Sequence, residues 1–212
     1  MQHPWDTGDP EQNWRGYFIP GTSILRNRVG AQTPEGLRDA ENDLVEARVI
    51  ELREAPGLLG HRTYDLAYLQ ALHRQLFQDV YVWAGELRTV GIEKGGESFC
   101  PPGSIDQPMT HVAADIHRLN QLKEVPEADL AYTVAYLYDY TKFAHPFREG
   151  NGRTTREFFD LLLSERSAGL NWLNTDLTEL HNACHSARSE SDLRGLTAMF
   201  AKILDNDPAY DF

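Results

Sequence analysis

The segment from residue 145 to residue 156 reads HPFREGNGRTTR. Its glycines, Gly150 and Gly152, disfavour a helix interior, because each glycine costs about 1 kcal/mol there. They permit a tight turn whose backbone N–H groups point in one direction. Residues 153–165 have the pattern of a helix, so these N–H groups are expected at a helix N-terminus. The segment therefore predicts a site for an anion.

The charged side chains of the segment suit the same purpose. Arg153 and Arg156 are three residues apart and share one helical face, and a guanidinium binds phosphate oxygens two at a time. Glu149 precedes the turn, and a carboxylate beside bound phosphates is the usual protein ligand for Mg²⁺. His145 can exchange a proton near neutral pH. Together these residues predict a site that handles nucleotide phosphates.

A structural interpretation of the same residues exists. The segment can be a loop that is capped by an acid and closed by two ion pairs, and a single histidine near an apolar helix end is usually structural. A single Gly-x-Gly is also a weak signal. The combination of all these residues in one short segment favours the phosphate site.

Residues 145–156 fill every fixed position of the Fic motif, His-Pro-Phe-x-(Asp/Glu)-Gly-Asn-Gly-Arg-x-x-Arg. Residues 76–90 are similar to the stretch that leads into the flap hairpin of the same family. The resemblance extends from about residue 17 to about residue 204. It implies a mainly α fold, in which a Fic-type helical bundle carries a small β-hairpin flap beside the active-site loop.

The resemblance implies protein adenylylation, the transfer of AMP from ATP to a Tyr, Thr or Ser hydroxyl of a target protein. His145 would be the general base, and Glu149 would hold Mg²⁺ against the α- and β-phosphates. Asn151 and the loop amides would hold the α-phosphoryl oxygen, and Arg153 and Arg156 the outer phosphates. The residues to which the resemblance assigns nucleotide binding are Lys94, Gly95, Arg148, Gly150, Asn151, Gly152, Arg153 and Arg156.

Regulation in the family often involves a Ser/Thr-x-x-x-Glu-(Gly/Asn) helix, whose Glu pairs with the second motif arginine, here Arg156. Ser186 and Glu190 have this spacing, but Ser191 stands where Gly or Asn is expected. The N-terminal portion lacks such a segment. The resemblance therefore favours a separate small antitoxin-like inhibitory protein over Glu190.

Composition limits the other function classes. The 212 residues carry a formal net charge of −12 and are 41% hydrophobic, which predicts one globular domain and argues against a nucleic-acid or membrane-surface protein. Two cysteines are too few for a disulfide framework and fit a reduced compartment. The first residues lack the basic and apolar regions of a signal peptide. We expect a cytoplasmic protein, or one delivered into a host cell by a secretion system.

Periodicity and capping residues predict the domain organisation. Residues 1–16 are expected to be a flexible arm, 17–204 the Fic domain and 205–212 an acidic tail. Two β-like segments, 88–92 and 98–100, flank a glycine-rich turn and predict the hairpin. Its exposed edge can pair with an extended segment of a target, so the flap is taken as residues 88–100. The predicted helices cover residues 34–54, 65–80, 106–123, 127–143, 153–165, 176–189 and 191–204.

Other histidines and cysteines receive structural interpretations. His73 lies on an apolar helical stripe and is expected to be a packed, hydrogen-bonded core residue. His181, Cys184 and His185 have a spacing that could bind zinc. No further metal motif accompanies them, and a partly buried polar helix face is favoured. Cys100 is expected to be a semi-buried thiol.

Two alternative functions remain open. A phosphodiester hydrolase that removes AMP could use the same Glu149 and His145, with water in place of the target hydroxyl. A non-catalytic module of the same fold could present only its hairpin edge to a partner. The intact phosphate loop argues against the second alternative, because a scaffold gains nothing from it.

Overall fold

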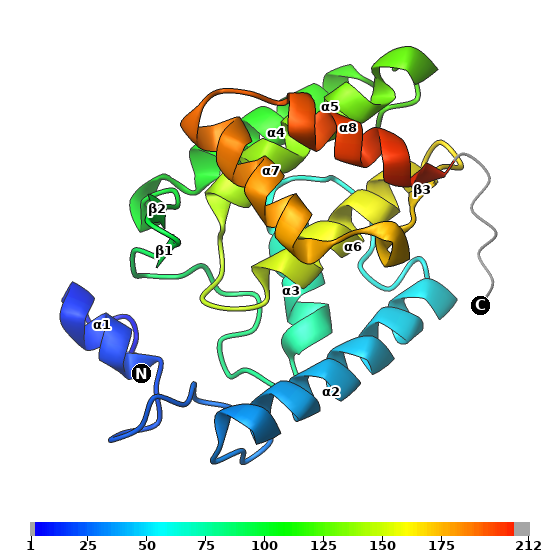
Figure 1. The fold of residues 1–212 in the computed structure, drawn as a ribbon. Helices are drawn as coiled ribbons and strands as arrows, with labels where there is room; N and C mark the ends of the chain where they lie inside the picture. The colour runs from blue at the N-terminus through cyan, green and yellow to red at the C-terminus, as the bar shows by residue number, and fades with distance from the viewer. Residues whose placement is uncertain (1–2, 206–212) are drawn as a thin grey trace. The chain divides into compact units, whose positions relative to one another are not determined.

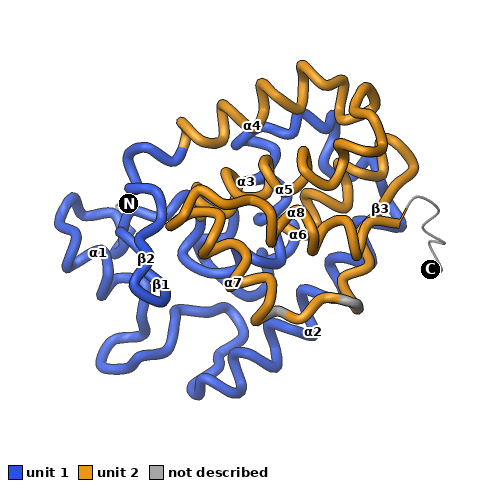
Figure 2. Tube along the Cα trace, turned by 45° about the horizontal axis from the view of Figure 1, so that its top comes forward, with its two compact units in different colours: residues 1–105, 146–154 blue, residues 106–145, 155–212 orange. Residues whose placement is uncertain are grey.

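The computed structural model describes residues 3–205, apart from the side chains of Asn174 and Leu177. The chain forms two compact units (Figure 2). Unit 1 contains residues up to 105 together with 146–154, and unit 2 contains 106–145 together with the residues from 155 onward. The chain passes from one unit to the other twice within the segment 145–156.

The described residues are mostly helical, which confirms the predicted fold class (Figure 1). None of their helices has both the length and the apolarity needed to cross a membrane. Unit 1 contains α1 (Pro10–Gly16), α2 (Pro34–Glu54), α3 (Leu66–Phe77), β1 (Glu93–Lys94), β2 (Glu97–Ser98), the 3₁₀ turn η1 (Pro102–Ser104) and the first turn of α6 (Asn151–Ser164). Unit 2 contains α4 (Asp106–Arg118), α5 (Glu127–Ala144), the rest of α6, β3 (Gly169–Leu170), η2 (Trp172–Asn174), α7 (Leu177–Ser189), α8 (Arg194–Ile203) and β4 (Leu204–Asp205).

Helices α2 and α3 begin where the sequence predicts. Thr33 caps α2 by accepting a hydrogen bond from the Gly36 N–H at 3.1 Å, and Pro34 occupies the first helical position. Asp65 caps α3 by accepting from the Tyr68 N–H at 2.8 Å. The inner face of α3 is apolar and almost wholly buried, and it packs against α2. Its buried residues are Tyr68, Leu69, Leu72, His73, Leu76 and Phe77.

Aromatic rings fill the centre of unit 1. The His73 ring stacks on Phe147 with centroids 3.8 Å apart and on Phe77 at 4.6 Å. Tyr81 stacks on Trp83 at 4.3 Å, and all these rings are at most 1% exposed. The motif residue Phe147 is therefore part of the hydrophobic core, and offset aromatic stacks of this kind add about 1 kcal/mol each beyond their burial.

Unit 2 is a helical bundle around α5. This helix packs against α4, α7 and α8. Its residue Tyr138 contacts Phe159 of α6 at 5.2 Å and Phe200 of α8 at 5.1 Å. Strand β3 pairs with β4 in an antiparallel register that places Leu170 opposite Leu204. The long apolar helix thus occupies the bundle interior, as its composition predicts.

The hairpin is shorter than predicted, and its turn differs. Strand pairing joins Glu93 to Ser98 and Lys94 to Glu97, so these residues are strand rather than turn. The turn is the pair Gly95 and Gly96, with φ of +62° and +81°. Such a two-residue turn matches the twist of a hairpin, whereas a five-residue turn was expected. The expected strand 88–92 is not a strand.

Several other boundaries differ from prediction. Residues 10–16 of the expected flexible arm form a helix, and Trp5 is only 4% exposed. Helix α3 ends at residue 77 rather than 80, and α4 ends at Arg118 rather than near 123, because residues 120–122 are left-handed. Asp205 pairs in β4 rather than belonging to a tail. The rest of the predicted tail, 206–212, lies outside the described residues.

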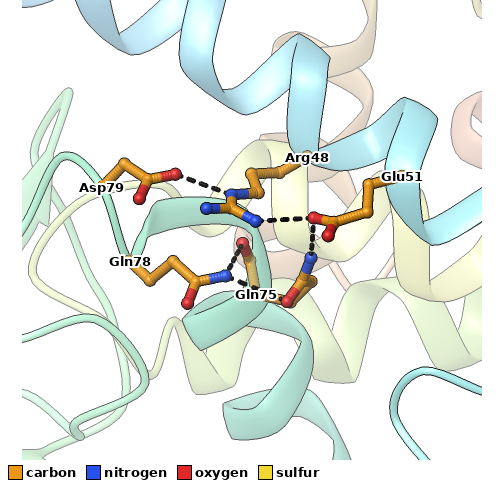
Figure 3. A network of polar contacts seen from close by, with 5 residues as sticks. All are labelled: Arg48, Glu51, Gln75, Gln78 and Asp79. Atoms are coloured by element: carbon orange, nitrogen blue, oxygen red, sulfur yellow. Dashed lines mark hydrogen bonds and ion pairs between the residues drawn. The ribbon is translucent and has the colours of Figure 1, made fainter.

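A polar network joins α2 to the end of α3 (Figure 3). Arg48 binds Glu51 and Asp79, each at 2.6 Å. Gln75 donates to the same Glu51 carboxylate at 2.8 Å and accepts from Gln78 at 3.0 Å. The hydrogen bond from Arg48 holds the pKa of Glu51 below its usual value.

We expect Arg48→Met to lower the melting temperature by about 2 °C, because a partly exposed charge network contributes modestly to stability. The difference from the parent should shrink as the pH falls below the ordinary titration range of a glutamate, because the Glu51 carboxylate then becomes protonated and its contact with Arg48 is lost. Differential scanning fluorimetry at several pH values measures this difference in melting temperature. Arg38→Met is the control, since Arg38 is exposed and approaches the exposed Asp39 at the long distance of 4.0 Å. Equal shifts for both variants would contradict this account of the network.

Candidate nucleotide site

His145 ends α5 in a left-handed conformation, with φ of +40° and ψ of +58°. Its N–H donates to the Thr141 carbonyl at 3.4 Å, which closes the last helical turn. Pro146 follows and cannot continue a helix. A non-glycine residue in this region costs about 1 kcal/mol or more, and such strain concentrates at functional positions. The predicted base thus occupies a locally strained position at the end of a buried helix.

The loop that follows is closed by the side chain of Asn151. Its Oδ1 accepts from the Phe147 N–H at 2.9 Å, and its Nδ2 donates to the Phe147 carbonyl at 2.8 Å. Asn151 is 5% exposed. The sequence assigned this residue to a phosphoryl oxygen, whereas the structure uses its amide to fix the loop backbone.

Gly150 is the point at which the loop turns into α6. Its φ is +84°, and a Cβ at this position would lie 2.5 Å from the Phe77 ring. Only glycine fits both conditions. The Gly150 N–H donates to the side chain of Glu149 at 3.0 Å, and Glu149 is exposed. Glu149, the candidate metal ligand, therefore lies outside the core. The turn that carries it is packed against the Phe77 ring.

Helix α6 begins at Asn151, so Gly152 lies in its first turn. The sequence instead predicts that Gly152 belongs to a tight turn before the helix. The Thr154 N–H donates to the Gly150 carbonyl at 3.1 Å and the Thr154 hydroxyl to the same oxygen at 3.0 Å. The N–H groups of residues 151–153 precede this first intrahelical bond. They form the positive end of the helix, which is the predicted anion site.

Arg153 is held by α2. Its guanidinium forms an ion pair with Glu41, donates to Asn42 at 3.4 Å and lies 5.1 Å from the centre of the Phe77 ring. Glu41 also accepts from the Tyr81 hydroxyl at 2.8 Å and is 7% exposed. Burial raises the pKa of the Glu41 carboxyl, and the charge of Arg153 opposes that rise.

Arg148 lies against three aromatic residues near the N-terminus. Its guanidinium carbon is 4.4 Å from the Trp14 ring centre, 5.3 Å from that of Phe18 and 5.7 Å from that of Tyr17. Burial lowers the pKa of Arg148. The resemblance assigned Arg148 to the nucleotide, and the structure adds that aromatic rings hold its position through cation–π contacts.

Arg156 belongs to unit 2, where its guanidinium lies 5.9 Å from the centre of the Trp172 ring. The Trp172 indole N–H donates to both oxygens of Asp160, at 3.0 and 2.9 Å. Glu190, the inhibitory candidate, is an exposed residue at the C-cap of α7. Within the described part of the chain, no ion pair joins it to Arg156.

The flap is connected to the motif loop through Arg88. The Arg88 N–H donates to the Pro146 carbonyl at 2.9 Å. Its guanidinium, in a residue that is 2% exposed, donates to the carbonyls of Val90 and Cys100, one on each side of the hairpin. Lys94 is exposed on β1, next to the turn. Arg88 therefore holds both arms of the hairpin at its base.

His73 is fully buried and hydrogen-bonded, as predicted. Its Nδ1 accepts from the Gly85 N–H at 2.8 Å, and its Nε2 contacts the Glu149 carbonyl at 3.0 Å. Burial lowers its pKa to about 3, so the ring is neutral at physiological pH.

The possible zinc ligands on α7 point in different directions. Cys184 is 9% exposed and faces the core of unit 2, whereas His181 and His185 are exposed. In residues 3–205 no group of three or more His, Cys, Asp or Glu side chains could hold a metal ion. Cys100, at 2% exposure, is more deeply buried than expected.

The sequence did not indicate Glu41, Arg88 or Trp14 as neighbours of the site. One feature of the sequence could have identified Glu41. It is a carboxylate on the inward side of the predicted helix 34–54, where apolar residues are expected. Trp14 stands in a segment without periodicity, and Arg88 begins a short β-like segment whose pattern does not indicate that its guanidinium is buried. Their positions depend on contacts with residues far away in the chain.

Comparison with known proteins identifies the family of the chain. The Fic/DOC family profile matches residues 63–163. A probable protein adenylyltransferase of Sinorhizobium fredii is 35% identical over 144 residues, which span 68% of this chain and 72% of that protein. The chain belongs to the Fic/DOC family.

Further relatives extend the Fic match. The probable protein adenylyltransferase Fic of Escherichia coli is 29% identical over 188 residues, 89% of this chain and 91% of that protein. The crystal structure of the Bartonella tribocorum effector BepC with bound AMPPNP has a TM-score of 0.83 at 23% identity, over 90% of this chain and 97% of that one. At 23% identity, the match to the BepC structure supports the fold alone.

We expect Gly150→Ala to disrupt the Fic loop, because a Cβ would meet Phe77 and an L-residue at this φ is strained. The variant should lose about 2 kcal/mol of unfolding free energy in urea titrations. Gly91→Ala is the matched control, since its Cβ would have no neighbour within 4 Å. A Gly150→Ala protein as stable as the control would refute the tight fit.

We expect Glu41→Ala to cost about 2 kcal/mol of unfolding free energy, because it leaves the Tyr81 hydroxyl and the Arg153 guanidinium without their shared acceptor. Glu41→Gln keeps an acceptor and should cost less. Glu46→Ala, an exposed change on the same helix, should be close to neutral. Chemical denaturation measures the unfolding free energy of all three variants. The loss should be largest for Glu41→Ala, smaller for Glu41→Gln and smallest for Glu46→Ala.

Proposed function

We propose that the chain is a protein adenylyltransferase, which transfers AMP from ATP to a hydroxyl side chain of a target protein. The observation that supports this most directly is the turn at Gly150. It places the first-turn N–H groups of α6 directly after an exposed carboxylate, Glu149, and behind a loop that the core holds rigid. This arrangement suits a triphosphate.

His145 is the general base in this proposal. It accepts the proton of the target hydroxyl while that oxygen forms a bond to the α-phosphorus of ATP. The bond between the α-phosphorus and the bridging oxygen breaks, and pyrophosphate leaves with the electron pair. Most of the rate enhancement comes from positioning and from stabilising charge on the phosphoryl oxygens, as in phosphoryl transfer generally.

The residues present fit a bound Mg²⁺. Mg²⁺ in nucleotide enzymes is typically held by one or two carboxylates together with substrate phosphates and water. Glu149 supplies one exposed carboxylate at the turn, and one of its oxygens is already oriented by the Gly150 N–H. When bound, the ion would neutralise charge on the phosphates. Glu149 would hold it, and the loop would keep Glu149 in place.

The phosphates are bound by backbone and guanidinium groups. The first-turn N–H groups of α6 bind the α-phosphoryl oxygens, and Asn151 contributes by fixing their backbone. Arg156 binds an outer phosphate from its position over Trp172. Arg153, whose guanidinium is paired with Glu41, adds its positive charge near the phosphates. Arg148 and the flap residues Lys94 and Gly95 complete the predicted nucleotide contacts.

The partner is a target protein that carries the modified hydroxyl. The hairpin offers it a short exposed edge at residues 93–94 and 97–98, and an extended target segment can pair with such an edge. A small inhibitory protein that occupies Arg156 remains the favoured form of regulation over Glu190. The site of action is the cytoplasm of the producing cell, or that of a host cell into which the chain is delivered.

The test compares the parent with His145→Ala, using α-labelled ATP, Mg²⁺ and a protein extract. The parent should label at least one target band, and the variant should label it at least about 100-fold less, because general-base catalysis contributes that much. Mg-ATP should raise the melting temperature of both proteins by about 5 °C, since His145 is not needed for binding. His117→Ala, an exposed change on α4, is the control and should behave as the parent.

The same assay separates the alternatives. Equal labelling by the parent and His145→Ala would reject His145 as the base. A melting temperature that Mg-ATP leaves unchanged, together with no labelling, would support a non-catalytic binding module. Release of AMP from a pre-labelled target without new labelling would support the hydrolase.

A further inference from the structure

His73 is a buried polar residue whose two ring nitrogens both find backbone partners. It lies on the inner face of α3 and is 0% exposed. Buried polar groups need hydrogen-bond partners, and most buried histidines find them in nearby side chains, water or backbone. Here the partners are Gly85, twelve residues away in the chain, and Glu149, seventy-six residues away.

These partners determine the tautomer. The Gly85 N–H can only donate, so Nδ1 of His73 is the acceptor at 2.8 Å. The proton of the neutral ring is therefore on Nε2, which donates to the Glu149 carbonyl at 3.0 Å. The ring stacks on both Phe147 and Phe77, which opposes a flip that would remove both nitrogens from their partners.

The Glu149–Gly150 peptide is therefore held on both sides. His73 binds its carbonyl, and the Glu149 side chain accepts from its N–H at 3.0 Å. The Phe77 ring lies directly against Gly150. This peptide leads into Gly150, the residue directly before α6, so its orientation affects both the exit direction of the Glu149 side chain and the start of the helix.

We propose that His73 is a positioning residue of the nucleotide site. Its Nε2–H fixes the Glu149–Gly150 peptide plane and so keeps the Glu149 carboxylate oriented for Mg²⁺. The part of this inference that concerns Mg²⁺ rests on the proposed function, whereas the hold on the loop does not. Residues that orient a metal ligand typically contribute 10- to 100-fold to metal affinity.

Two substitutions separate the two ring nitrogens. An asparagine amide reaches about as far as Nδ1, so His73→Asn keeps the acceptor for Gly85 and loses the donor to Glu149. A glutamine amide reaches about as far as Nε2, so His73→Gln keeps the donor to Glu149. Both variants lose the ring stack on Phe147, so both should lower the melting temperature by a similar amount.

The first measurement is hydrogen exchange of the peptide covering residues 147–153, without nucleotide. We expect exchange to be about 10-fold faster in His73→Asn and within about 3-fold of the parent in His73→Gln. The second is the Mg²⁺ concentration that gives half-maximal AMP transfer. It should rise about 10-fold in His73→Asn and less than about 3-fold in His73→Gln.

Equal changes in both variants, in proportion to their lower melting temperatures, would overturn the proposal and leave His73 as packing alone. A parent that transfers no AMP would refute the proposed function, and the exchange measurement would still decide whether His73 holds the loop. If a variant does not fold, ¹⁵N spectra of the parent imidazole decide. A proton on Nε2 and none on Nδ1 supports the proposal, and the opposite tautomer overturns it.

Discussion

The site depends on the double hydrogen bond between the Asn151 side chain and the Phe147 backbone. One amide group satisfies a buried N–H and a buried C=O at once, which closes the loop on itself within four residues. In a buried setting, leaving either backbone group unpaired costs about 1–3 kcal/mol, so alternative loop conformations are strongly disfavoured. The motif thus carries the means of its own rigidity, and its helix N-terminus is formed before any ligand arrives.

This constraint explains why the motif arginines need separate anchors. A rigid loop cannot adjust to place a flexible guanidinium, so each position is set by its own neighbours. Arg148 lies against aromatic rings near the N-terminus, Arg153 pairs with Glu41 of α2, and Arg156 lies over Trp172. Fixing these side chains in advance removes part of the entropy loss that binding a phosphate would otherwise incur. In a chain of net charge −12, it also concentrates the positive charge at one segment.

The sequence predicted what local rules determine. Thr33 and Pro34 indicated the start of α2, and Asp65 that of α3, because capping requires only nearby residues. It also predicted that a helix begins at the glycines of the motif, where α6 starts at Asn151. The predicted turn of the hairpin was wrong, because the neighbours of the two glycines, Glu93 and Lys94 on one side and Glu97 on the other, pair as strand and leave a two-residue glycine turn. The burial of Arg88 could not be predicted, since its guanidinium is satisfied by carbonyls, and a carbonyl is available at every residue.

His73 illustrates the same limit more sharply. Its place on an apolar stripe correctly predicted a core histidine, but burial of an imidazole has a consequence that the stripe does not reveal. A neutral imidazole has one donor and one acceptor, and burial requires that both be used. Both partners, at Gly85 and Glu149, are backbone groups. No side-chain pattern therefore marks them. A core histidine that looks unrelated to the motif in this way binds the backbone of a motif residue, the Glu149 carbonyl, so packing and the geometry of the motif loop are linked at this position.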